Sequence, residues 1–446
     1  MHKTIFLIFI TFLAINSAKA QSSSRTNEIK ISSKILNDER TIKIHLPEGY
    51  SEEKLYPVIY TTDGGFDMFD IAKGYIDILK MPSTNVIPPP ILVGIVQKNR
   101  SNELRAFGNW DGKQFIQFIE KELVPYVDST YSTSSFNTMI GHSDGAEFNH
   151  YLMTSKDNSF RGFISLSPAF NEDMKPEIAQ YYATYDKAQL YQFVANASRD
   201  IASRIAAGNS IDSLYQATAN QSISFKNQTY KADHESLMAI ALLDGLQFIF
   251  QDYRNRESYS SIVDYGENYL QTLKNRYGID TEYNFYDIAQ FLTDIIDRKD
   301  IEDYRYCINL INENNLVFGQ KMDPVNMAWH YSDMEFYSKT IESMNKAIEE
   351  FDSPNIYPNV FYLHVNTAQN AYIKEGRTSE VVSFLERCRA VLPERYYLSM
   401  SYRIAHFSLN NNVDTSKGRE ALDYCKKNFK ENKLFSMDDL TILEQK

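Results

Sequence analysis

Residues 139–148 read MIGHSDGAEF, and residues 141–145 within them match the pattern G-x-S-x-G. In a nucleophile elbow this pattern lies on a sharp turn from a strand to a helix, and the turn exposes the serine side chain above the sheet. The strand-like run FNTMI precedes the motif, and a helical run from Ala146 to Met153 follows it. Glycines at both ends avoid collisions across a turn whose serine has a strained backbone. The motif therefore predicts a nucleophile at Ser143, and the alternative is a tight turn with an inert serine.

The base that such a serine needs is predicted by chain order. In proteins with this elbow the acid and then the histidine follow the serine. His234, in TYKADHESLMAI, is the only histidine between His150 and His330. It follows the last strand-like run and opens a helix, which predicts that it is the base. His142 lies inside the elbow and cannot reach back to Ser143, so we interpret it as structural.

The first half of the chain has the alternation of an α/β domain. TIKIHLP places Ile42, Ile44 and Leu46 on one face, as in a half-buried strand. The runs YPVIYTT, ILVGIV, FNTMIG, GFISLS and LYQFVA are compact and apolar, as expected for strands buried on both faces. Helical patterns separate them, including residues 113–127 and the run LMAIALLDGLQFIF. The alternation predicts a mostly parallel sheet covered by helices.

After Arg254 the strand signal stops and successive amphipathic helices follow. The helix pairs that we expect are 285–297 with 300–313, 324–336 with 338–351, 359–375 with 378–391, and 396–410 with 416–429. The stretch NAYIKEGRTSEVVSFLERC resembles the tetratricopeptide helix-turn-helix, and Ala405 follows Ala371 by 34 residues, the period of that repeat. The signature Trp and Pro positions are not matched, so a generic helical bundle is the alternative. Both interpretations predict an all-α domain.

The N-terminus, MHKTIFLIFITFLAINSAKA, has an apolar run from Ile5 to Ile15 and then Ala-Lys-Ala before Gln21. This arrangement is typical of a secretory signal with an A-x-A cleavage site. The apolar run is short for a membrane span. We therefore expect a signal peptide over residues 1–20, a mature chain that is periplasmic or secreted, and no stable membrane span after cleavage. A retained N-terminal anchor is the alternative.

Charge and cysteine content exclude several classes of partner and cofactor. The chain of 446 residues has 46 basic and 58 acidic residues, and removal of Lys3 and Lys19 with the signal brings the net charge near −14. Such a surface repels phosphate backbones, so we expect no nucleic-acid partner. Cys307, Cys388 and Cys425 are odd in number and widely spaced, and no H-E-x-x-H motif occurs. The sequence therefore predicts no metal and no cofactor.

Residues from about 28 to 255 resemble the putative-esterase family of α/β-hydrolases. This family includes feruloyl and acetylxylan esterases, S-formylglutathione hydrolases, mycolyltransferases and ferric-siderophore esterases. The matching stretches are PVIYTTDGGFDMFD, LVGIVQKNRSNEL, FIEKELVPYVDSTY, GHSDGAEF and FRGFISLSPAF, followed by the last histidine of the domain. They occur in the order of the family and span nearly the whole domain.

The resemblance implies further site residues. The backbone N–H of Asp144 and one from the Gly64–Gly65–Phe66 segment would form the oxyanion hole. Arg100 matches an arginine that lines the site in the family and contacts substrate in siderophore esterases, and a surface salt bridge is its alternative role. The chain departs from the family at Asp144, where an uncharged residue is common, and at Asn102, which replaces a second arginine of siderophore esterases. Both departures weaken the attraction for a highly anionic ferric catecholate.

The acid of the triad is the least defined member. Asp200 is the first carboxylate after the run LYQFVA and precedes His234, so we predict that it orients the imidazole. The position that aligns best with the acid of the family holds Ser198. Asp212 is a second candidate carboxylate. If no carboxylate serves, a slow Ser-His dyad remains.

Together these patterns predict a signal peptide (1–20), an α/β-hydrolase domain (21–257) and an all-α helical-repeat domain (258–446). The function that we expect is an exported serine esterase that hydrolyses small-molecule carboxylic esters, such as siderophore or carbohydrate esters, through an acyl-enzyme. Acyl transfer to another alcohol uses the same groups. The alternative is a catalytically weak or inactive hydrolase fold that acts as a binding or scaffold protein, with a protein partner on its helical domain.

Overall fold

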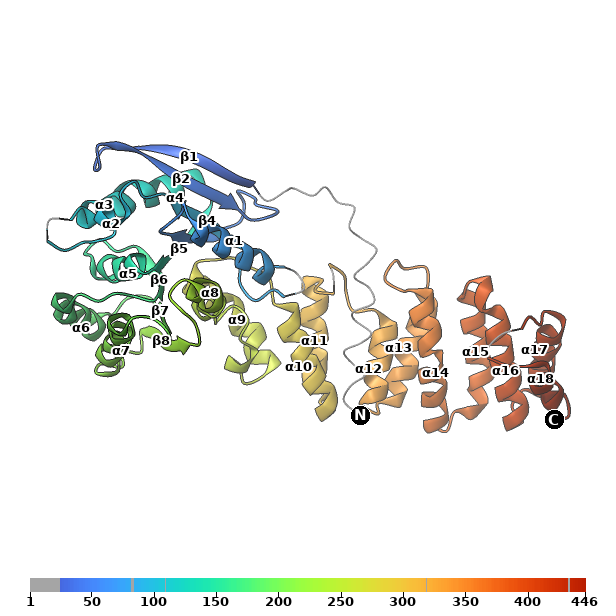
Figure 1. The fold of residues 1–446 in the computed structure, drawn as a ribbon. Helices are drawn as coiled ribbons and strands as arrows, with labels where there is room; N and C mark the ends of the chain where they lie inside the picture. Colours follow the sequence, from blue (N-terminus) through green and yellow to red (C-terminus); the bar gives the residue numbers. More distant parts are fainter. Residues whose placement is uncertain (1–24, 82–83, 109, 318, 432–433) are drawn as a thin grey trace. The chain divides into compact units, whose positions relative to one another are not determined.

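A computed structural model describes residues 25–81, 84–108, 110–317, 319–431 and 434–446 of the chain. The predicted signal peptide lies outside the described residues. The chain forms two compact units (Figure 1). The first contains the described residues up to Asn255 together with Leu270–Thr281, and the second contains Arg256–Tyr269 and Glu282–Lys446.

The first unit is built on an eight-stranded sheet. In spatial order the strands are β1 (Arg25–Ser33), β2 (Asp38–Leu46), β4 (Ile91–Ile95), β3 (Tyr56–Thr61), β5 (Thr133–His142), β6 (Phe160–Leu166), β7 (Leu190–Ala197) and β8 (Ile223–Tyr230). β1 and β2 pair antiparallel, and all pairings from β4 to β8 are parallel. Every residue of β3, β4 and β7 is buried, as their continuous apolar runs predict.

Helices cover both faces of this sheet (Figure 1). α1 (Asp67–Leu79) and α8 (Ser236–Ile249) pack together on one face. The other face is covered by α3 (Gly112–Phe118), α4 (Val124–Thr130), α5 (Asp144–Thr154), α6 (Lys175–Thr184) and α7 (Ala202–Gln216). A π-helical turn, η2 (Ile119–Leu123), joins α3 to α4. The short helix α2 (Arg100–Glu103) follows β4.

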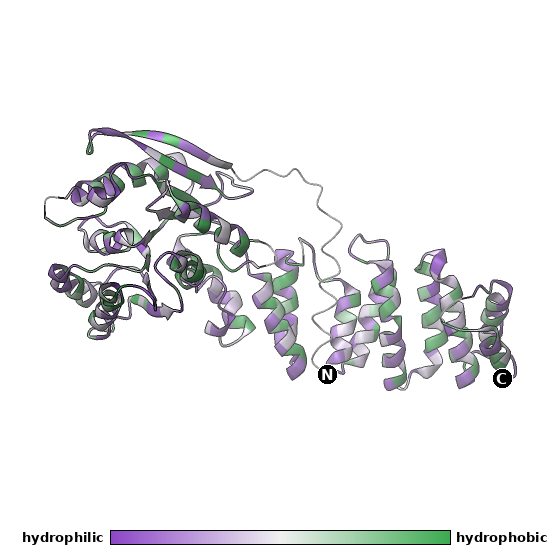
Figure 2. Cartoon of the chain, in the orientation of Figure 1, coloured by the Kyte–Doolittle hydropathy of each residue, from purple (hydrophilic) through white to green (hydrophobic). Residues whose placement is uncertain are grey.

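The second unit is all-α. Its helices are α10 (Phe285–Arg298), α11 (Ile301–Asn314), α12 (Pro324–Asp333), α13 (Tyr337–Glu349), α14 (Pro358–Lys374), α15 (Val381–Val391), α16 (Tyr397–Asn411), α17 (Thr415–Lys427) and α18 (Met437–Glu444). Figure 2 shows apolar and polar residues interleaved along these helices, as expected for amphipathic helices. The helices from α12 to α18 share one apolar core. Among the described residues, no helix combines the length and apolar character that a membrane crossing requires.

The predicted fold class is confirmed: a mostly parallel α/β sheet precedes an all-helical region. Two strands were not predicted, and both lie at the edges of the sheet. β8 reads ISFKNQTY, and only its first residue is buried. An edge strand needs no continuous apolar run, because one side faces solvent, so its sequence resembles a loop. The helix expected over residues 113–127 forms, but with the π-helical turn inside it.

The division between the units differs from the predicted boundary at residue 257. Leu270–Thr281, which includes the second half of α9 (Ile262–Tyr277), belongs to the first unit. Tyr277 is fully buried there. Its ring lies 5.0 Å from that of Phe136, and its hydroxyl donates to Ile249 O at 3.1 Å. The first unit is therefore completed by a segment that follows the predicted boundary in the chain.

We expect a chain ending at residue 281 to fold as the first unit and a chain ending at residue 257 to be less stable. Loss of a fully buried aromatic side chain costs about 3–5 kcal/mol. Urea unfolding of the two chains measures the difference. Tyr277→Ala in the longer chain is the matched control and should reproduce most of the loss, whereas equal stability of all three proteins would contradict the assignment.

Candidate active site

The elbow predicted from residues 141–145 forms at the carboxyl end of β5. β5 ends at His142 and α5 begins at Asp144, with Ser143 on the turn between them. Ser143 has φ 61° and ψ −120°, a left-handed conformation that is strained for a residue with a side chain. Its N–H donates to Leu166 O at 2.9 Å, which ties the turn to the end of β6.

The two glycines of the motif are required by close packing. A Cβ at position 141 would lie 2.1 Å from Gly145 O, so this glycine avoids a collision across the turn. A Cβ at position 145 would lie 2.4 Å from Thr62 Oγ1. The second glycine is therefore needed for contact with the end of β3, and not for clearance across the turn as the sequence predicted.

The structure brings two of the other predicted residues together. His234 lies in the turn between β8 and α8, and Asp200 lies in the turn after β7. His234 Nδ1 is 2.8 Å from Asp200 Oδ2, with 4% of the carboxylate side chain and 28% of the imidazole exposed. Because Asp200 binds Nδ1, it does not occupy Nε2, the other ring nitrogen of the partly exposed imidazole. A neutral imidazole with its proton on Nδ1 can act as a base through Nε2.

The environment of Asp200 favours its ionised form. Burial raises the pKa of this carboxyl, but hydrogen bonds from Ser167 and His234 and from the N–H of Ile201 outweigh burial, and the net pKa is lowered. The other candidates do not reach the imidazole. Asp212 lies within α7 and accepts a hydrogen bond from Gln216. Ser198 is exposed.

His142 links the elbow to the turn that carries His234. His142 Nε2 lies 2.9 Å from His234 O, and the centroids of the two rings are 4.5 Å apart. Because a carbonyl only accepts, Nε2 of His142 carries a proton and Nδ1 does not. Burial, together with a smaller contribution from the charge of His234, lowers the pKa of His142 to about 4. His142 is thus a neutral structural group that holds the His234 turn beside Ser143.

Ser143 and His234 are neighbours without a direct bond. Within the described residues, Ser143 Oγ makes no hydrogen bond to the imidazole. Catalytic hydrogen bonds are often long in ligand-free enzymes and tighten when substrate binds. The contact through His142 fixes the two turns next to each other.

Two backbone N–H groups near Ser143 are available to a substrate oxygen. In the Gly64–Gly65–Phe66 segment, Gly64 N donates to Ile95 O and Phe66 N donates to Asp63 O, both at 2.9 Å. Among the described residues, the N–H groups of Gly65 and Asp144 have no partner. A Cβ at position 64 would lie 2.5 Å from the backbone of Gly94, so the loop that carries Gly65 packs directly on β4.

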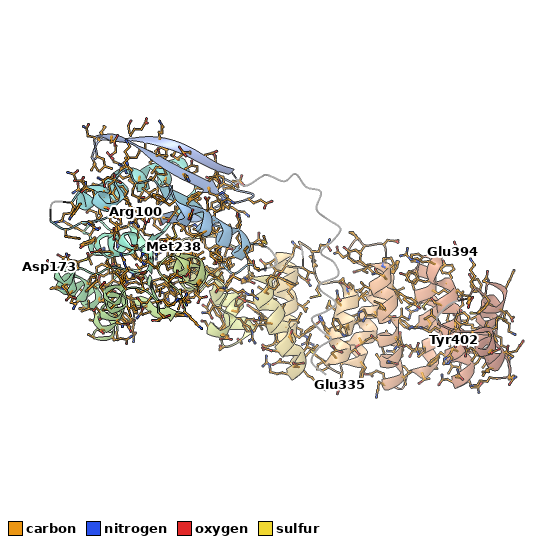
Figure 3. All side chains as sticks on the ribbon, viewed as in Figure 1. Arg100, Asp173, Met238, Glu335, Glu394 and Tyr402 are labelled. Carbon is orange, nitrogen blue, oxygen red and sulfur yellow. The ribbon has the colours of Figure 1, made fainter. Side chains whose placement is uncertain are left out.

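Arg100, labelled in Figure 3, is held by the protein itself. Its Nε and Nη2 donate to the carboxylate of Asp63 at 2.5 and 3.0 Å, and Nη2 also donates to His142 O at 3.1 Å. The carboxylate of Asp63 is 8% exposed and the guanidinium side chain is 29% exposed. Burial lowers the pKa of Arg100, but the carboxylates of Asp63, Asp144 and Glu235 together outweigh burial and raise it. Arg100 therefore cross-links the loop after β3 to the elbow.

Apart from Arg100 and His234, the residues that surround Asp144 and Asp200 were not predicted from the sequence. Three guanidinium groups lie 3.6–3.7 Å from the Asp144 carboxylate: those of Arg100, Arg105 and Arg204. Ser167, directly after β6, contacts both Asp200 and His234. The signal for Ser167 was its position at the carboxyl end of a strand beside the acid-bearing strand, because polar residues there share one edge of a parallel sheet. Arg204 lies on a helix without a pattern that distinguishes it.

The described residues contain no cluster of three or more His, Cys, Asp or Glu side chains with the arrangement of a metal site. The arrangement that they do contain, a strained serine, a carboxylate-bound histidine and unpaired N–H groups, has the chemical parts of an acyl-transfer site. Fold and site together define an α/β-hydrolase.

Comparison with known proteins gives the family. The "Putative esterase" family matches residues 33–219. The uncharacterized protein YjcH of Bacillus subtilis (strain 168) is 32% identical over 169 residues, which cover 36% of this chain and 69% of that protein. The chain therefore belongs to the putative-esterase family, a family of esterase-type hydrolases.

Two solved structures share its fold. An uncharacterised protein from Capnocytophaga ochracea DSM 7271 matches over 78% of this chain and 100% of its own, with 17% identity and a TM-score of 0.60. An IroE-like serine hydrolase from Shewanella oneidensis matches over 65% of this chain and 99% of its own, with 22% identity and a TM-score of 0.51.

We expect the stability of the protein to fall as His142 is forced to accept a proton. The unfolded chain binds a proton at this residue below pH about 6.5, whereas the folded chain does so only near pH 4. Between these values the unfolded state holds more protons at His142, so this residue's contribution to the free energy of unfolding decreases with falling pH by up to about 1.4 kcal/mol per unit. Urea unfolding at pH 7, 6 and 5 measures the slope.

His142→Gln is the informative variant, because its amide can donate to His234 O without titrating. We expect a shallower pH dependence in this variant. His406→Gln, at an exposed position on α16, is the control and should leave the slope unchanged. An unchanged slope in His142→Gln would contradict the assignment.

Proposed function

We propose that the protein is a serine esterase with Ser143 as nucleophile, His234 as base and Asp200 as the orienting acid. The observation that carries the proposal is the strained backbone of Ser143 next to a histidine that is hydrogen-bonded to a buried carboxylate at 2.8 Å. Strain of this kind at a non-glycine residue is typical of functional sites. Membership of an esterase family supports the same conclusion.

In this proposal His234 Nε2 takes the proton of Ser143 as Oγ attacks the ester carbonyl, and Asp200 stabilises the imidazolium that forms. The carbonyl oxygen becomes negative and accepts hydrogen bonds from the N–H groups of Asp144 and Gly65, neither of which donates to another described residue. The imidazolium then protonates the leaving alcohol. Water attacks the acyl-enzyme by the reverse sequence of proton transfers and releases the acid.

The substrate class that we propose is a small carboxylic ester, with siderophore and carbohydrate esters as the first candidates. Arg100 is a candidate contact for the substrate through the exposed part of its guanidinium group. A panel of siderophore lactones, feruloyl and acetyl sugar esters and acyl thioesters would rank these classes by kcat/KM. The same panel with an added alcohol acceptor distinguishes hydrolysis from acyl transfer.

We also propose that the mature protein is exported, as the N-terminal sequence predicts, and acts in the periplasm or outside the cell. The second unit would then serve as a tetratricopeptide-like surface for a protein partner. Its successive packed helices support this role. N-terminal sequencing of the protein from cell fractions tests cleavage after Ala20.

We expect Ser143→Ala to lower the hydrolysis of p-nitrophenyl esters by about 10³-fold or more, because it removes the nucleophile without adding bulk. Labelling by a fluorophosphonate should be lost in parallel, with the melting temperature maintained. Ser213→Ala, at an exposed position on α7, is the control and should retain both activities. Full activity of Ser143→Ala would refute the proposed mechanism and favour the binding or scaffold alternative.

We expect Asp200→Asn to reduce turnover by about 10²- to 10⁴-fold, because the amide no longer stabilises the imidazolium or selects its tautomer. Asp212→Asn and Ser198→Ala should retain activity, since neither side chain reaches His234. One assay on the three variants compares the candidates. A loss confined to Asp212→Asn, or no loss in either Asp variant, would overturn the assignment of the acid.

A further inference from the structure

Ser167 occupies the junction between the nucleophile and the acid. It directly follows β6, whose last residue, Leu166, accepts the hydrogen bond from Ser143 N. On its other side, Ser167 N donates to Ala195 O of β7, the strand that leads to Asp200. One peptide unit therefore lies between the turn that carries Ser143 and the strand that carries the acid.

The hydroxyl of Ser167 faces the histidine–carboxylate pair. It donates to Asp200 Oδ2, and its oxygen lies 3.1 Å from His234 Nδ1. An ionised carboxylate only accepts, so the single hydroxyl proton is directed at Asp200. The Ser167 oxygen then faces His234 only as an acceptor. The Nδ1 proton of His234 is consequently shared between Asp200 and Ser167.

The backbone conformation of Ser167 is unfavourable for a residue that has a side chain. The residue is 1% exposed and has φ 53°, in the left-handed region that glycine adopts without strain. Its carbonyl accepts from Arg204 Nη1 at 2.7 Å, so the turn is held in this conformation from outside. Glycine would satisfy the backbone, and only the hydroxyl satisfies the two contacts with the triad.

We propose that Ser167 is a positioning residue of the site: its hydroxyl orients Asp200 and provides a second acceptor for the Nδ1 proton of His234. This inference rests on the proposed serine-esterase function. As His234 takes the proton of Ser143, its Nδ1–H bond becomes more acidic and both acceptors stabilise the resulting charge. Ser167 itself exchanges no proton and contacts no substrate.

Two substitutions separate the hydroxyl from the backbone. Ser167→Gly and Ser167→Ala both remove the hydroxyl, but only glycine relieves the strain at φ 53°. We expect both variants to lose about 10- to 100-fold in kcat, as for a hydrogen bond to a charged group, with KM unchanged. The glycine variant should melt at a higher temperature than the alanine variant. Ala219→Gly, at an exposed position of the same unit with φ 44°, is the backbone control and should retain full activity.

The variant Asp200→Asn tests whether Ser167 acts through Asp200 or has only a structural role. If Ser167 acts through Asp200, adding Ser167→Gly to Asp200→Asn should cost less than threefold, because coupled residues are non-additive. The proton resonance of His234 Nδ1–H, followed by NMR in the resting protein, should shift in Ser167→Gly and not in Ala219→Gly. Wild-type kcat in both Ser167 variants, an undiminished loss in the Asp200→Asn background, or an unshifted resonance would each overturn the proposal.

Failure of the proposed function is recognised separately. It would appear as a wild-type protein that neither hydrolyses esters nor reacts with a fluorophosphonate at Ser143. The NMR comparison requires no turnover and would still decide whether Ser167 shares the Nδ1 proton.

Discussion

The left-handed backbone of Ser143 is the constraint on which the rest of the site depends. A side chain in this conformation is strained, so the surroundings must hold the turn in place. Close packing fixes the turn: Gly141 lies against the carbonyl of Gly145, and Gly145 lies against Thr62 at the end of β3. A methyl group at either glycine would push the turn away from the sheet. The strained backbone of Ser143 therefore depends on glycines, which have no side chain, at positions 141 and 145.

The order of the strands explains how distant residues meet at this turn. β5, β6, β7 and β8 are consecutive neighbours and run parallel, so their carboxyl ends lie along one edge. The elbow follows β5, Ser167 follows β6, Asp200 lies in the turn after β7, and His234 lies in the turn after β8. Ligand sites in open parallel sheets form at this edge for the same reason. The order of these residues along the chain thus becomes the spatial order of the proposed triad.

Sequence patterns predicted the features that depend on burial or on steric rules. The buried strands had continuous apolar runs, and the elbow had both glycines that its packing requires. The histidine could be selected because few histidines occur in the domain. The edge strands could not be recognised, since β8 is polar and half-exposed and resembles a loop. Tyr277 was assigned to the helical region because nothing in a helical pattern specifies which core its buried face meets.

The residues around Asp144 show why tertiary charge balance is hard to predict. An acid directly after the proposed nucleophile would repel the oxyanion that the proposed mechanism forms beside it. Three guanidinium groups within 3.7 Å of Asp144 offset that charge, and they come from α2, the loop after it and α7. The hydrophobic periodicity of the sequence does not indicate that these distant segments lie next to each other.

The same balance limits how strongly the site can attract an anion. Two hydrogen-bonding groups of Arg100 are taken by Asp63, and Asp144 faces Arg105 and Arg204. Glu147, one turn along α5, interacts with the latter two arginines, and burial raises its pKa. Three arginines are thus opposed by three carboxyl groups rather than left as an open positive surface. In the proposed function a substrate anion would have to compete with the carboxylates of the protein itself. We therefore expect the shape of the substrate and its ester group to have more weight in recognition than its net charge.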